Sequence, residues 1–505
     1  MAVWRHFHGD VVDPGATPGT LAINRAQHVL VAPDGFIEYV GTEPPPPPWR
    51  DGLATTLIEL PRGCVLMPGF IDTHVHAAQS QYAGTGTDLP LMQWLAKYAF
   101  PSERRLTNDL GESERVYDAL VRKLLRNGTT TALYFAVIGV ASSQVLVEVA
   151  SRLGQRAFVG KVAMDRLAPA DYVETSEEAV AGTEAFILHV RDICRAYSSS
   201  ERALADWGPP GTLPTSERGD SDEASNRQIW TARDLPLVEP VVTPRFVPCC
   251  TESLLQDLGA LAEKHGVLIQ SHAVESVDCL DCVAEMHPGS NEVEIFERCG
   301  LLGKRSVMAH CVHISEYQAA TFRRTGTGIA CCPLSNFYFA GGALRMAALL
   351  EAGNKIGLGT DVAGGYSHRM LDSVRHAVTT HLCVASADAN AMRMAGKEIH
   401  GQAGGRIIRC EGVAPGAGRP VGRDEFNYKH AFWTATVGGA QLVGLEGKVG
   451  RILPGHAFDT CVVNLSQWLD DTGASLETAF EKFVHLGGEA EITEVYVQGR
   501  PSMPA

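Results

Sequence analysis

Short runs of apolar residues, each of the length expected for a buried strand, recur through the middle of the chain. Eight runs have this character, at 70–76, 130–135, 157–164, 238–246, 268–272, 306–310, 328–332 and 355–361. Between most of them the apolar positions follow helical spacing, as in 113–126, 252–264 and 346–353. Because strands and helices alternate, the pattern predicts an α/β fold, a (β/α)8 barrel of the TIM type. A doubly wound open sheet is the alternative.

The two ends of the chain have a different sequence pattern, in which short apolar runs are separated by turns. These runs lie at 21–23, 28–31, 36–40, 459–464 and 494–498. Strands from both ends can pair in one small unit. We therefore predict a small β-sandwich built from residues 1–67 and 441–505, which flanks a barrel domain of residues 68–440.

Two segments of the predicted barrel have the composition of insertions. Residues 198–233 are rich in Ser, Asp, Glu, Gly and Pro, and residues 401–425 are rich in Gly. Such compositions favour irregular surface segments over packed elements. We expect both segments to lie outside the regular strand and helix units.

The overall composition is that of a globular protein, with 505 residues, 45% of them hydrophobic and 20% charged. These values exclude a fully disordered chain and a coiled-coil rod. Acidic residues outnumber basic residues by 58 to 43, which gives a net charge of -15. A field of that sign disfavours binding to nucleic acid or to an anionic membrane surface. We expect neither kind of partner.

The cysteines and the first residues indicate a reducing compartment. The chain has 13 cysteines, and the adjacent pairs Cys249–Cys250 and Cys331–Cys332 suit a disulfide framework badly. Residues 1–10 contain no long apolar run behind a basic start, so we expect no signal peptide. The longest apolar stretch, 132–141, is too short to cross a bilayer. These features predict a cytoplasmic protein.

The strongest local signal for chemistry is the segment PGFIDTHVH at 68–76, which ends the first long apolar run. Side chains two residues apart on a strand point to the same face, so His74 and His76 can both point into the mouth of the barrel. Two neighbouring imidazoles are suitable ligands for Zn²⁺. Barrel active sites lie at the C-terminal ends of strands, where this pair lies. A chance H-x-H among 18 histidines is the alternative.

Three further polar residues end strand-like runs: His272, His310 and Asp361. Taken singly, each has an ordinary explanation, such as hydrogen bonding to a loop or, for Asp361, capping the turn at 364–365. Together they favour a metal centre, because burying so much polarity at one rim without a cation is costly. Glu275, three residues after His272, can take a proton from a metal-activated water at this rim. A helix-start position favoured by the dipole is the alternative for Glu275.

Longer segments form a distinctive set along the chain. They are PGFIDTHVHAAQ from Pro68, DLPLMQWLAKYAFPSE from Asp88, NGTTTALYFA from Asn127, GQRAFVGKVAMD from Gly154, VTPRF from Val242, QSHAVE from Gln270, MAH from Met308 and KIGLGTDVAGGYSHRMLD from Lys355. In these segments the sequence resembles the amidohydrolase superfamily and, within it, the guanine deaminases. The resemblance covers roughly residues 66–499 apart from the two insertions. The TPRF, QSH-x-x-E and LGTDVAGGYS segments distinguish it from other amidohydrolases.

The resemblance implies a role for individual residues. It implies one Zn²⁺ per subunit with the ligands His74, His76, His272 and Asp361. It implies a purine site made of Gln79, Arg245, Phe246 and His310. An arginine offers a planar set of donors for the O6/N7 edge of guanine, and a glutamine can both donate and accept. Without the resemblance, a rim ion pair and core packing would better explain Arg245 and Phe246.

The implied reaction is the hydrolytic deamination of guanine to xanthine and ammonia, a step of purine catabolism. An activated water attacks C2 of guanine, and Glu275 carries the proton of this water to N3. Asp361 helps to protonate the leaving amino group, and His310 stabilises the charge that develops at the attacked centre. The resemblance also implies a cytoplasmic homodimer with a small-molecule substrate.

The sequence departs from the family pattern at a few positions. In the segment CCPLSN, Leu334 stands where the family usually has Asn, so the hydrogen bonding of this loop differs. Lys161 lies in a predicted strand, where some amidohydrolases use a carboxylated lysine between two metals. Because the resemblance is to the one-metal branch, we interpret Lys161 as structural.

His313 is close to His310 in sequence, and we favour His310 because it ends the strand. Trp94 either lines the pocket or packs in the core.

Two other functions remain as alternatives. The first is an amidohydrolase that deaminates or dehalogenates a different heterocycle, against which Arg245 and Gln79 argue. The second is a catalytically silent scaffold on the same fold, for which degraded metal ligands would be the sign. Every expected ligand is present. A substrate panel tests the first alternative, and metal analysis tests the second.

Overall fold

Eight parallel strands form the centre of the molecule, and hydrogen bonds join them in the order in which they occur along the chain. The computed structural model describes residues 4–46, 55–199, 235–398, 426–469 and 474–502. The eight strands are β6 (Phe70–His76), β7 (Thr129–Phe135), β8 (Arg156–Ala163), β9 (Val238–Pro244), β10 (Leu268–Ala273), β11 (Ser306–His310), β12 (Gly328–Cys331) and β13 (Lys355–Leu358). Most of their residues are buried, as expected for a parallel sheet covered on both faces.

The sequential strand order distinguishes a barrel from a doubly wound sheet, in which the order reverses at a switch point. The first and last strands also meet. The hydroxyl of Thr73 on β6 donates to the carbonyl of Leu358 on β13 at 2.8 Å. Just beyond β13, the amide of Asp361 donates to the carbonyl of His74, also at 2.8 Å. The predicted (β/α)8 barrel is therefore confirmed.

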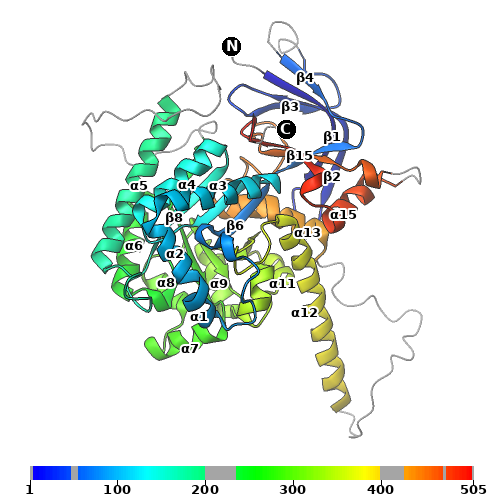
Figure 1. Cartoon of the computed structure of the whole chain (residues 1–505). Helices are drawn as coiled ribbons and strands as arrows, with labels where there is room; N and C mark the ends of the chain where they lie inside the picture. Colours follow the sequence, from blue (N-terminus) through cyan, green and yellow to red (C-terminus); the bar gives the residue numbers. More distant parts are fainter. Residues whose placement is uncertain (1–3, 47–54, 200–234, 399–425, 470–473, 503–505) are drawn as a thin grey trace.

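Helices surround the barrel strands (Figure 1). Those between β6 and β9 are η1 (Ala77–Tyr82), α1 (Leu91–Trp94), η2 (Leu95–Ala99), α2 (Phe100–Asn108), α3 (Leu110–Arg126), α4 (Val140–Leu153) and α5 (Ser176–Ser199). Those between β9 and β13 are η3 (Val247–Cys249), α6 (Glu252–His265), α7 (Val277–Met286), α8 (Glu292–Arg298), α9 (Glu316–Thr325), α10 (Pro333–Ser335), η4 (Asn336–Ala340) and α11 (Met346–Glu351). After β13 come α12 (Met370–Glu398), α13 (Tyr428–Trp433), η5 (Thr434–Gly438) and α14 (Gly439–Leu442).

Local sequence signals begin and end several of these helices. The Thr251 hydroxyl accepts from the amide of Leu254 at 3.2 Å and so caps the start of α6. The same helix ends at Gly266, whose φ of 63° is strained for other residues. At the start of α3, the Asp109 carboxylate accepts from the amide of Glu112 at 2.8 Å. Each cap turns the chain back towards the barrel, so the next strand can begin.

The two ends of the chain form one mixed sheet beside the barrel. Its strands, in hydrogen-bonded order, are β16 (Arg500–Pro501), β15 (Ile492–Val497), β14 (Thr460–Asn464), β5 (Cys64–Pro68), β1 (Trp4–Pro14), β2 (Leu21–Val31) and β3 (Ile37–Gly41), with β4 (Thr55–Glu59) paired to β1. The short helix η6 (Ser466–Trp468), helix α15 (Leu476–Leu486) and η7 (Glu489–Glu491) lie between β14 and β15. Figure 1 shows the N-terminal strands in blue and the C-terminal elements in red side by side.

This mixed sheet curls around its own core. In a flat sheet β1 and β15, three intervals apart, would be separated by roughly 14 Å. The ring centroids of Phe7 on β1 and Tyr496 on β15 are nevertheless only 5.3 Å apart, and Phe458 stacks on Phe7 at 4.7 Å. Strands from both ends therefore enclose one apolar core, in agreement with the small β-sandwich expected from the sequence.

A few boundaries differ from the sequence-based expectations. The barrel strand β9 ends at Pro244 and β13 ends at Leu358, so Arg245, Phe246 and Asp361 lie in the loops that follow. Strand β1 was not expected, and β2 is one continuous strand where two short runs were expected. The predicted insertion at 401–425 lies outside the described residues. So does the insertion at 198–233, except that its first two residues end α5.

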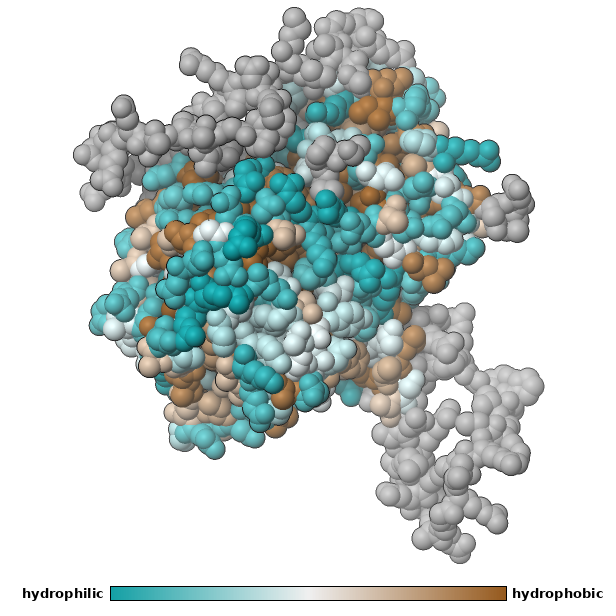
Figure 2. All heavy atoms as spheres, viewed as in Figure 1, coloured by the Kyte–Doolittle hydropathy of each residue, from teal (hydrophilic) through white to brown (hydrophobic). Residues whose placement is uncertain are grey.

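The surface facing the viewer in Figure 2 is mainly hydrophilic, with hydrophobic residues in small separate groups. Within the described ranges, no helix combines the length and the apolar character needed to cross a membrane. The twelve cysteines that lie in those ranges are all free thiols. The adjacent cysteine pairs thus do not form disulfides, as the sequence predicted.

Candidate metal centre and substrate pocket

Strand β6 brings His74 and His76 to the C-terminal mouth of the barrel. Both side chains are buried, and their ring centroids are 4.9 Å apart in an edge-to-face arrangement. The amide of His76 donates to the carbonyl of Val362 at 3.0 Å. The end of β6 is therefore held against the loop after β13, which carries Asp361.

His272, at the end of β10, completes a cluster of three imidazoles. Its Nε2 lies 3.0 Å from Nε2 of His76. On the other side of the ring, Nδ1 lies 2.7 Å from the carbonyl oxygen of Arg245, to which it must donate. The proton is thus fixed on Nδ1, and Nε2 is left as a lone pair pointing into the cluster, the arrangement found in histidine ligands of metals.

The carboxylate of Asp361 joins this cluster from the loop after β13. Its Oδ1 lies 3.3 Å from Nε2 of His74 and 3.5 Å from Nε2 of His76. The backbone of Asp361 has a φ of 48°, a conformation that Asp adopts more readily than most residues. This bend directs a carboxylate back over the end of β6, although β13 itself has already ended.

The donor set fits a zinc ion. Three imidazoles and one carboxylate are ligands that Zn²⁺ prefers. Two buried nitrogens at this centre, Nε2 of His74 and Nε2 of His310, have no hydrogen-bond partner. Since unpaired buried polar atoms are costly, a cation at this point would satisfy the one on His74.

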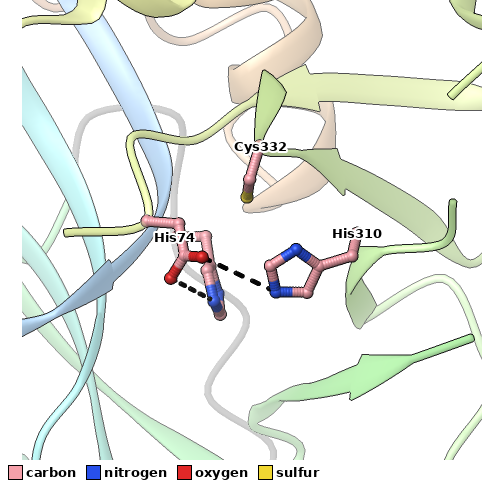
Figure 3. A group of neighbouring side chains, drawn as sticks. His74, His310 and Cys332 are labelled. Atoms are coloured by element: carbon pink, nitrogen blue, oxygen red, sulfur yellow. Dashed lines mark ion pairs between the residues drawn. The ribbon is translucent and has the colours of Figure 1, made fainter. Parts of the chain in front are cut away.

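A thiol also approaches the centre from the loop after β12. Cys332 contributes a sulfur atom to a second group of potential ligands with His74, His310 and Asp361 (Figure 3). Burial raises the pKa of the Cys332 thiol well above its ordinary value. Because only the thiolate is a good ligand, Cys332 is a weaker candidate than the histidines.

His310, at the end of β11, lies between two carboxylates. Its Nε2 is 3.6 Å from Oε1 of Glu275 and 3.8 Å from Oδ2 of Asp361. Its Nδ1 lies 3.0 Å from the side-chain oxygen of Asn336, which fixes a proton on Nδ1. The remaining nitrogen therefore faces the space between Glu275 and the metal cluster.

Burial controls the charge of these groups. It lowers the pKa values of His74, His76 and His272 well below the ordinary value, so the rings are neutral and can act as ligands. It also raises the pKa of Glu275 to about 8, with a further upward contribution from the charge of Asp361. A carboxyl group that titrates near neutral pH is suited to moving protons during a reaction.

A second buried carboxylate supports the cluster from behind. Asp72, two residues before His74, accepts from the hydroxyl of Thr360 at 2.5 Å, from its amide at 2.9 Å and from the amide of His74 at 3.2 Å. Burial raises the pKa of Asp72 to about 7, while the bonds from Thr360 lower it. Asp72 thus ties the strand that carries two imidazoles to the loop that carries Asp361.

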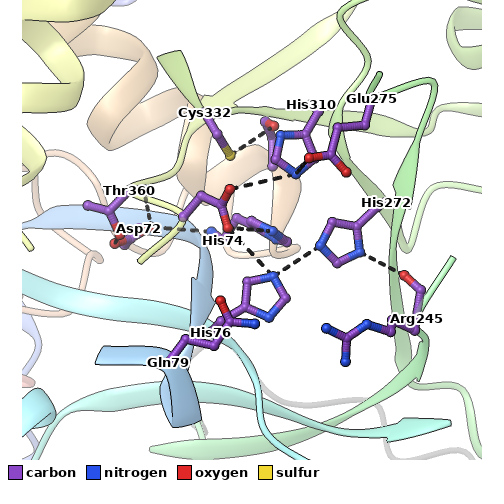
Figure 4. Close-up of polar contacts among 12 residues, drawn as sticks. Asp72, His74, His76, Gln79, Arg245, His272, Glu275, His310, Cys332 and Thr360 are labelled. Atoms are coloured by element: carbon purple, nitrogen blue, oxygen red, sulfur yellow. Dashed lines mark hydrogen bonds and ion pairs between the residues drawn. The ribbon is translucent and has the colours of Figure 1, made fainter. Parts of the chain in front are cut away.

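A pocket of about 420 Å³, partly open to solvent, lies beside this cluster. It is lined by His76, Gln79, Leu91, Trp94, Leu95, Arg245, Phe246, His272, Glu275, His310, Ser335, Phe339, Asp361 and Gly364. Its apolar wall and few convergent polar groups are typical of a site for a small, flat ligand. Figure 4 shows Gln79 and Arg245 below His76 and His272, on one side of the pocket.

The chain is similar to known proteins over most of its length. Residues 65–396 match the Amidohydrolase family. The chain is 35% identical over 439 residues to a guanine deaminase from Dictyostelium discoideum, covering 86% of this chain and 81% of that protein.

The chain belongs to the amidohydrolase family.

Two solved structures resemble this amidohydrolase over nearly its whole length. A guanine deaminase from C. acetobutylicum with bound guanine in the active site has a TM-score of 0.78 and 25% identity, and the match covers 99% of each chain. An adenosine deaminase from Xanthomonas campestris with bound zinc has a TM-score of 0.72 and 20% identity, covering 99% of this chain and 92% of that one. The second likeness concerns the fold alone.

All nine predicted site residues of the amidohydrolase lie around the pocket or the metal cluster: His74, His76, Gln79, Arg245, Phe246, His272, Glu275, His310 and Asp361. Trp94 also lines the pocket. Lys161 instead pairs with Glu174, with nitrogen-oxygen distances of 2.5 and 2.6 Å. His313 bonds the carbonyl of Ala340 at 2.8 Å and lies outside this set.

Sequence reasoning missed four residues that hold the site together: Glu103, Asp72, Thr360 and Asn336. Asp72 precedes His74 by two residues, so strand periodicity could have placed it on the same face. Asn336 ends the segment CCPLSN, but nothing in that segment predicts a bond to His310. Glu103 is the last residue of the quoted segment DLPLMQWLAKYAFPSE, but no spacing rule relates a residue on helix α2 to the barrel strands.

Proposed function

We propose that this amidohydrolase converts guanine and water to xanthine and ammonia, as a step of purine catabolism. The observation that carries the proposal is the close approach of two sets of groups. The pocket is lined on one side by a donor set suited to zinc, and also by a glutamine and an arginine suited to a purine edge. Relatives that span most of the chain are guanine deaminases, and a similar structure holds guanine in its active site.

In this proposal one Zn²⁺ per subunit is held by four ligands: His74, His76, His272 and Asp361. The neutral rings, the hydrogen bond that fixes Nδ1 of His272 and the unpaired Nε2 of His74 support this set. When bound, zinc lowers the pKa of a coordinated water to about 7 and so supplies a nucleophile at neutral pH.

Glu275 is the proton carrier of the proposed reaction. It removes a proton from the attacking water and delivers it to N3 of guanine while the water oxygen bonds to C2. The second proton reaches the leaving amino group with the help of Asp361, so that ammonia departs. His310, 3.6 Å from Glu275, stabilises the charge that develops at the attacked centre.

Gln79, Arg245 and Phe246 bind the purine in this proposal. Arg245 donates to the O6 side of the ring, and Gln79 bonds the adjacent edge. Phe246 is buried at the pocket wall, with its ring 6.4 Å from the His272 ring, and offers an apolar surface for the base. These contacts would hold C2 of guanine towards the metal cluster.

We also propose that the enzyme works as a homodimer in the cytoplasm. The cytoplasmic location is supported by the twelve free cysteines of the described residues, which suit a reducing compartment. Light scattering coupled to size-exclusion chromatography tests the dimer, with a mass of twice 54.3 kDa expected.

A substrate panel tests the function. Purified protein of known zinc content is incubated with guanine, adenine, cytosine and chlorinated or aminated triazines, and ultraviolet absorbance follows each ring. We expect guanine to be consumed with release of ammonia and the others to be unchanged. Turnover of a triazine or of adenine in preference to guanine would assign a different heterocycle. Zinc-free protein with no turnover of any compound even after zinc addition would favour the scaffold alternative.

A further inference from the structure

Glu103 lies behind the purine-binding side of the pocket, and its carboxylate is closed off from water. It belongs to helix α2, and its side chain is only 1% exposed. Its Oε1 accepts from Nε2 of Gln79 at 2.8 Å and from Nη2 of Arg245 at 3.0 Å. Its Oε2 accepts from Nη1 of Arg245 at 2.6 Å and from the hydroxyl of Tyr172 at 3.1 Å. A carboxylate has about four acceptor sites, so all of them are used.

This arrangement fixes the orientation of the Gln79 amide. Both oxygens of the Glu103 carboxylate accept hydrogen bonds from the guanidinium of Arg245, so they face Gln79 as acceptors. Gln79 must therefore present its nitrogen to Glu103. Its carbonyl oxygen then becomes the acceptor that it offers to the pocket it lines. Without Glu103, the amide could turn over and offer a donor instead.

The same carboxylate fixes Arg245. Two terminal nitrogens of the guanidinium bond Glu103, and the Cζ atom lies 4.9 Å from the ring centroid of Phe100. The side chain is 3% exposed and cannot swing into solvent. Its remaining N–H groups can only donate. The pocket wall thus combines a fixed donor with a fixed acceptor.

We propose that Glu103 is a positioning residue that selects a 6-oxopurine over a 6-aminopurine, an inference that rests on the proposed function. Guanine carries an acceptor at O6 beside a donor at N1–H, which matches the donor of Arg245 and the acceptor of Gln79. A 6-aminopurine carries a donor at the 6-amino group beside an acceptor at N1, which is the reverse. Sites built for one hydrogen-bond pattern can reject a mismatched ligand by roughly 10⁴-fold or more.

The test compares guanine with 2,6-diaminopurine, because both carry the 2-amino group that leaves and they differ only at C6 and N1. In the wild-type protein we expect kcat/KM to favour guanine strongly. In Glu103→Gln we expect KM for guanine to rise about tenfold or more, and the preference for guanine to fall by at least about tenfold. Zinc content should be unchanged, since Glu103 contacts none of the proposed ligands.

Asp459→Asn is the matched control. Asp459 also receives two bonds from one buried arginine, Arg156, at 2.9 and 3.2 Å, but it lies at the junction with the terminal sheet. This variant should lose stability and keep the preference for guanine. If Glu103→Gln does not fold, Glu103→Asp keeps the buried charge but shortens its reach. It should shift the preference in the same direction.

Two outcomes separate the inference from the function it rests on. An unchanged preference for guanine in a folded Glu103 variant would overturn the positioning role, whatever the stability of the variant. If the wild-type protein turns over neither purine, the proposed function fails. The dissociation constants of the same two purines are then measured for the wild type and for Glu103→Gln. An unchanged ratio of the two constants in the variant would overturn the positioning role.

Discussion

At the scale of single residues, the chemistry depends on where protons lie on buried rings. The backbone carbonyl of Arg245 and the side chain of Asn336 each accept from Nδ1 of a histidine, His272 and His310 respectively. Each bond turns a lone pair on Nε2 towards the reaction centre. Burial raises the pKa of Glu275 to about 8, so the protonation of this carboxyl group can change near neutral pH.

The first prediction concerns this carboxylate. Glu275→Gln should keep zinc but lower kcat by about 10²–10⁴-fold, because an amide cannot carry the proton from water to the ring. Guanine consumption and bound zinc are measured on the same sample. Glu239→Gln is the control, since Glu239 is a half-buried carboxyl group at the opposite end of its barrel strand, and it should keep wild-type turnover. Wild-type kcat in Glu275→Gln would exclude the proton-carrier role.

The sequence predicts the position of a side chain most directly where the end of a strand fixes that position. The four histidines of the site lie at or near the C-terminal ends of their strands: His74, His76, His272 and His310. Their convergence therefore follows from the parallel barrel alone. Glu103 could not be found in this way. Its helix lies in the long connection after β6, and only packing brings it within 3 Å of Arg245, which is 142 positions away.

At the scale of elements, the metal cluster is assembled by the junction of β6 with the loop after β13. Asp72 makes this junction through Thr360, and it bonds the amide of His74 as well. The sequence predicted both elements but extended the last strand to Asp361. Backbone pairing ends at Leu358, and the positive φ of Asp361 produces the turn that aims its carboxylate. Such a turn leaves no apolar pattern in the sequence.

We predict that Asp72→Asn weakens zinc binding by about 10–100-fold, because it removes the acceptor that joins the two ligand-bearing elements. Competition with a chelator of known affinity measures the zinc dissociation constant. The control is Asp13→Asn, in which a buried aspartate of the terminal sheet is changed without contact to the cluster. Equal zinc affinity in Asp72→Asn and the wild type would contradict the supporting role of this junction.

Helix α8 carries a buried carboxyl group that should make the stability of the fold depend on pH. Its first residue, Glu292, accepts from the amide of Val274, and burial raises its pKa to about 7, with a smaller upward contribution from Glu275. Between pH 4.5 and 7 the folded state therefore holds a proton that the unfolded state has lost. The favourable contribution of this group to stability is complete below pH 4.5, and it is lost as the pH rises to 7.

Glu292→Gln removes this titration and keeps an acceptor for Val274. Relative to the wild type, the variant should gain about 3 kcal/mol of unfolding free energy between pH 4.5 and pH 8. Urea denaturation of both proteins at the two pH values, without metal, measures the difference. A stability difference that does not change with pH would show that the pKa of Glu292 is the same in the folded and unfolded states.

The terminal sheet shows where element prediction fails. Strand β1 has the sequence WRHFHGDVVDP, in which polar residues are frequent, and half-buried positions outnumber buried ones over its first seven residues. Its pairing with β2 includes an irregularity between Gly9 and Val11. A half-exposed strand with a bulge gives no clean alternation of apolar and polar positions, so the sequence indicated its partner β2 but not β1 itself.

At the scale of the whole molecule, a buried ion pair joins the barrel to the terminal sheet. Arg156, at the start of β8, bonds Asp459 just before β14, and both side chains are at most 2% exposed. Asp459 also accepts from the amide of Gln498 at 2.7 Å. The C-terminal part of the terminal sheet and the barrel are therefore held at one point by a single carboxylate.

Removing this charge should destabilise the protein without changing its chemistry. Asp459→Asn leaves Arg156 buried without a counter-ion, which typically costs about 3–5 kcal/mol. Urea denaturation measures the loss, and guanine turnover at 25 °C should remain at the wild-type level. A wild-type midpoint in urea would show that the junction does not depend on this pair.

The central claim is that imidazoles and a carboxylate from distant parts of the chain hold one zinc ion that makes guanine deamination possible. The most direct test strips the metal with a chelator, adds zinc in steps and records guanine turnover at each step. We expect no turnover without metal and a linear rise that ends at one zinc per chain. Full turnover by metal-free protein, or no turnover at one bound zinc per chain, would contradict it.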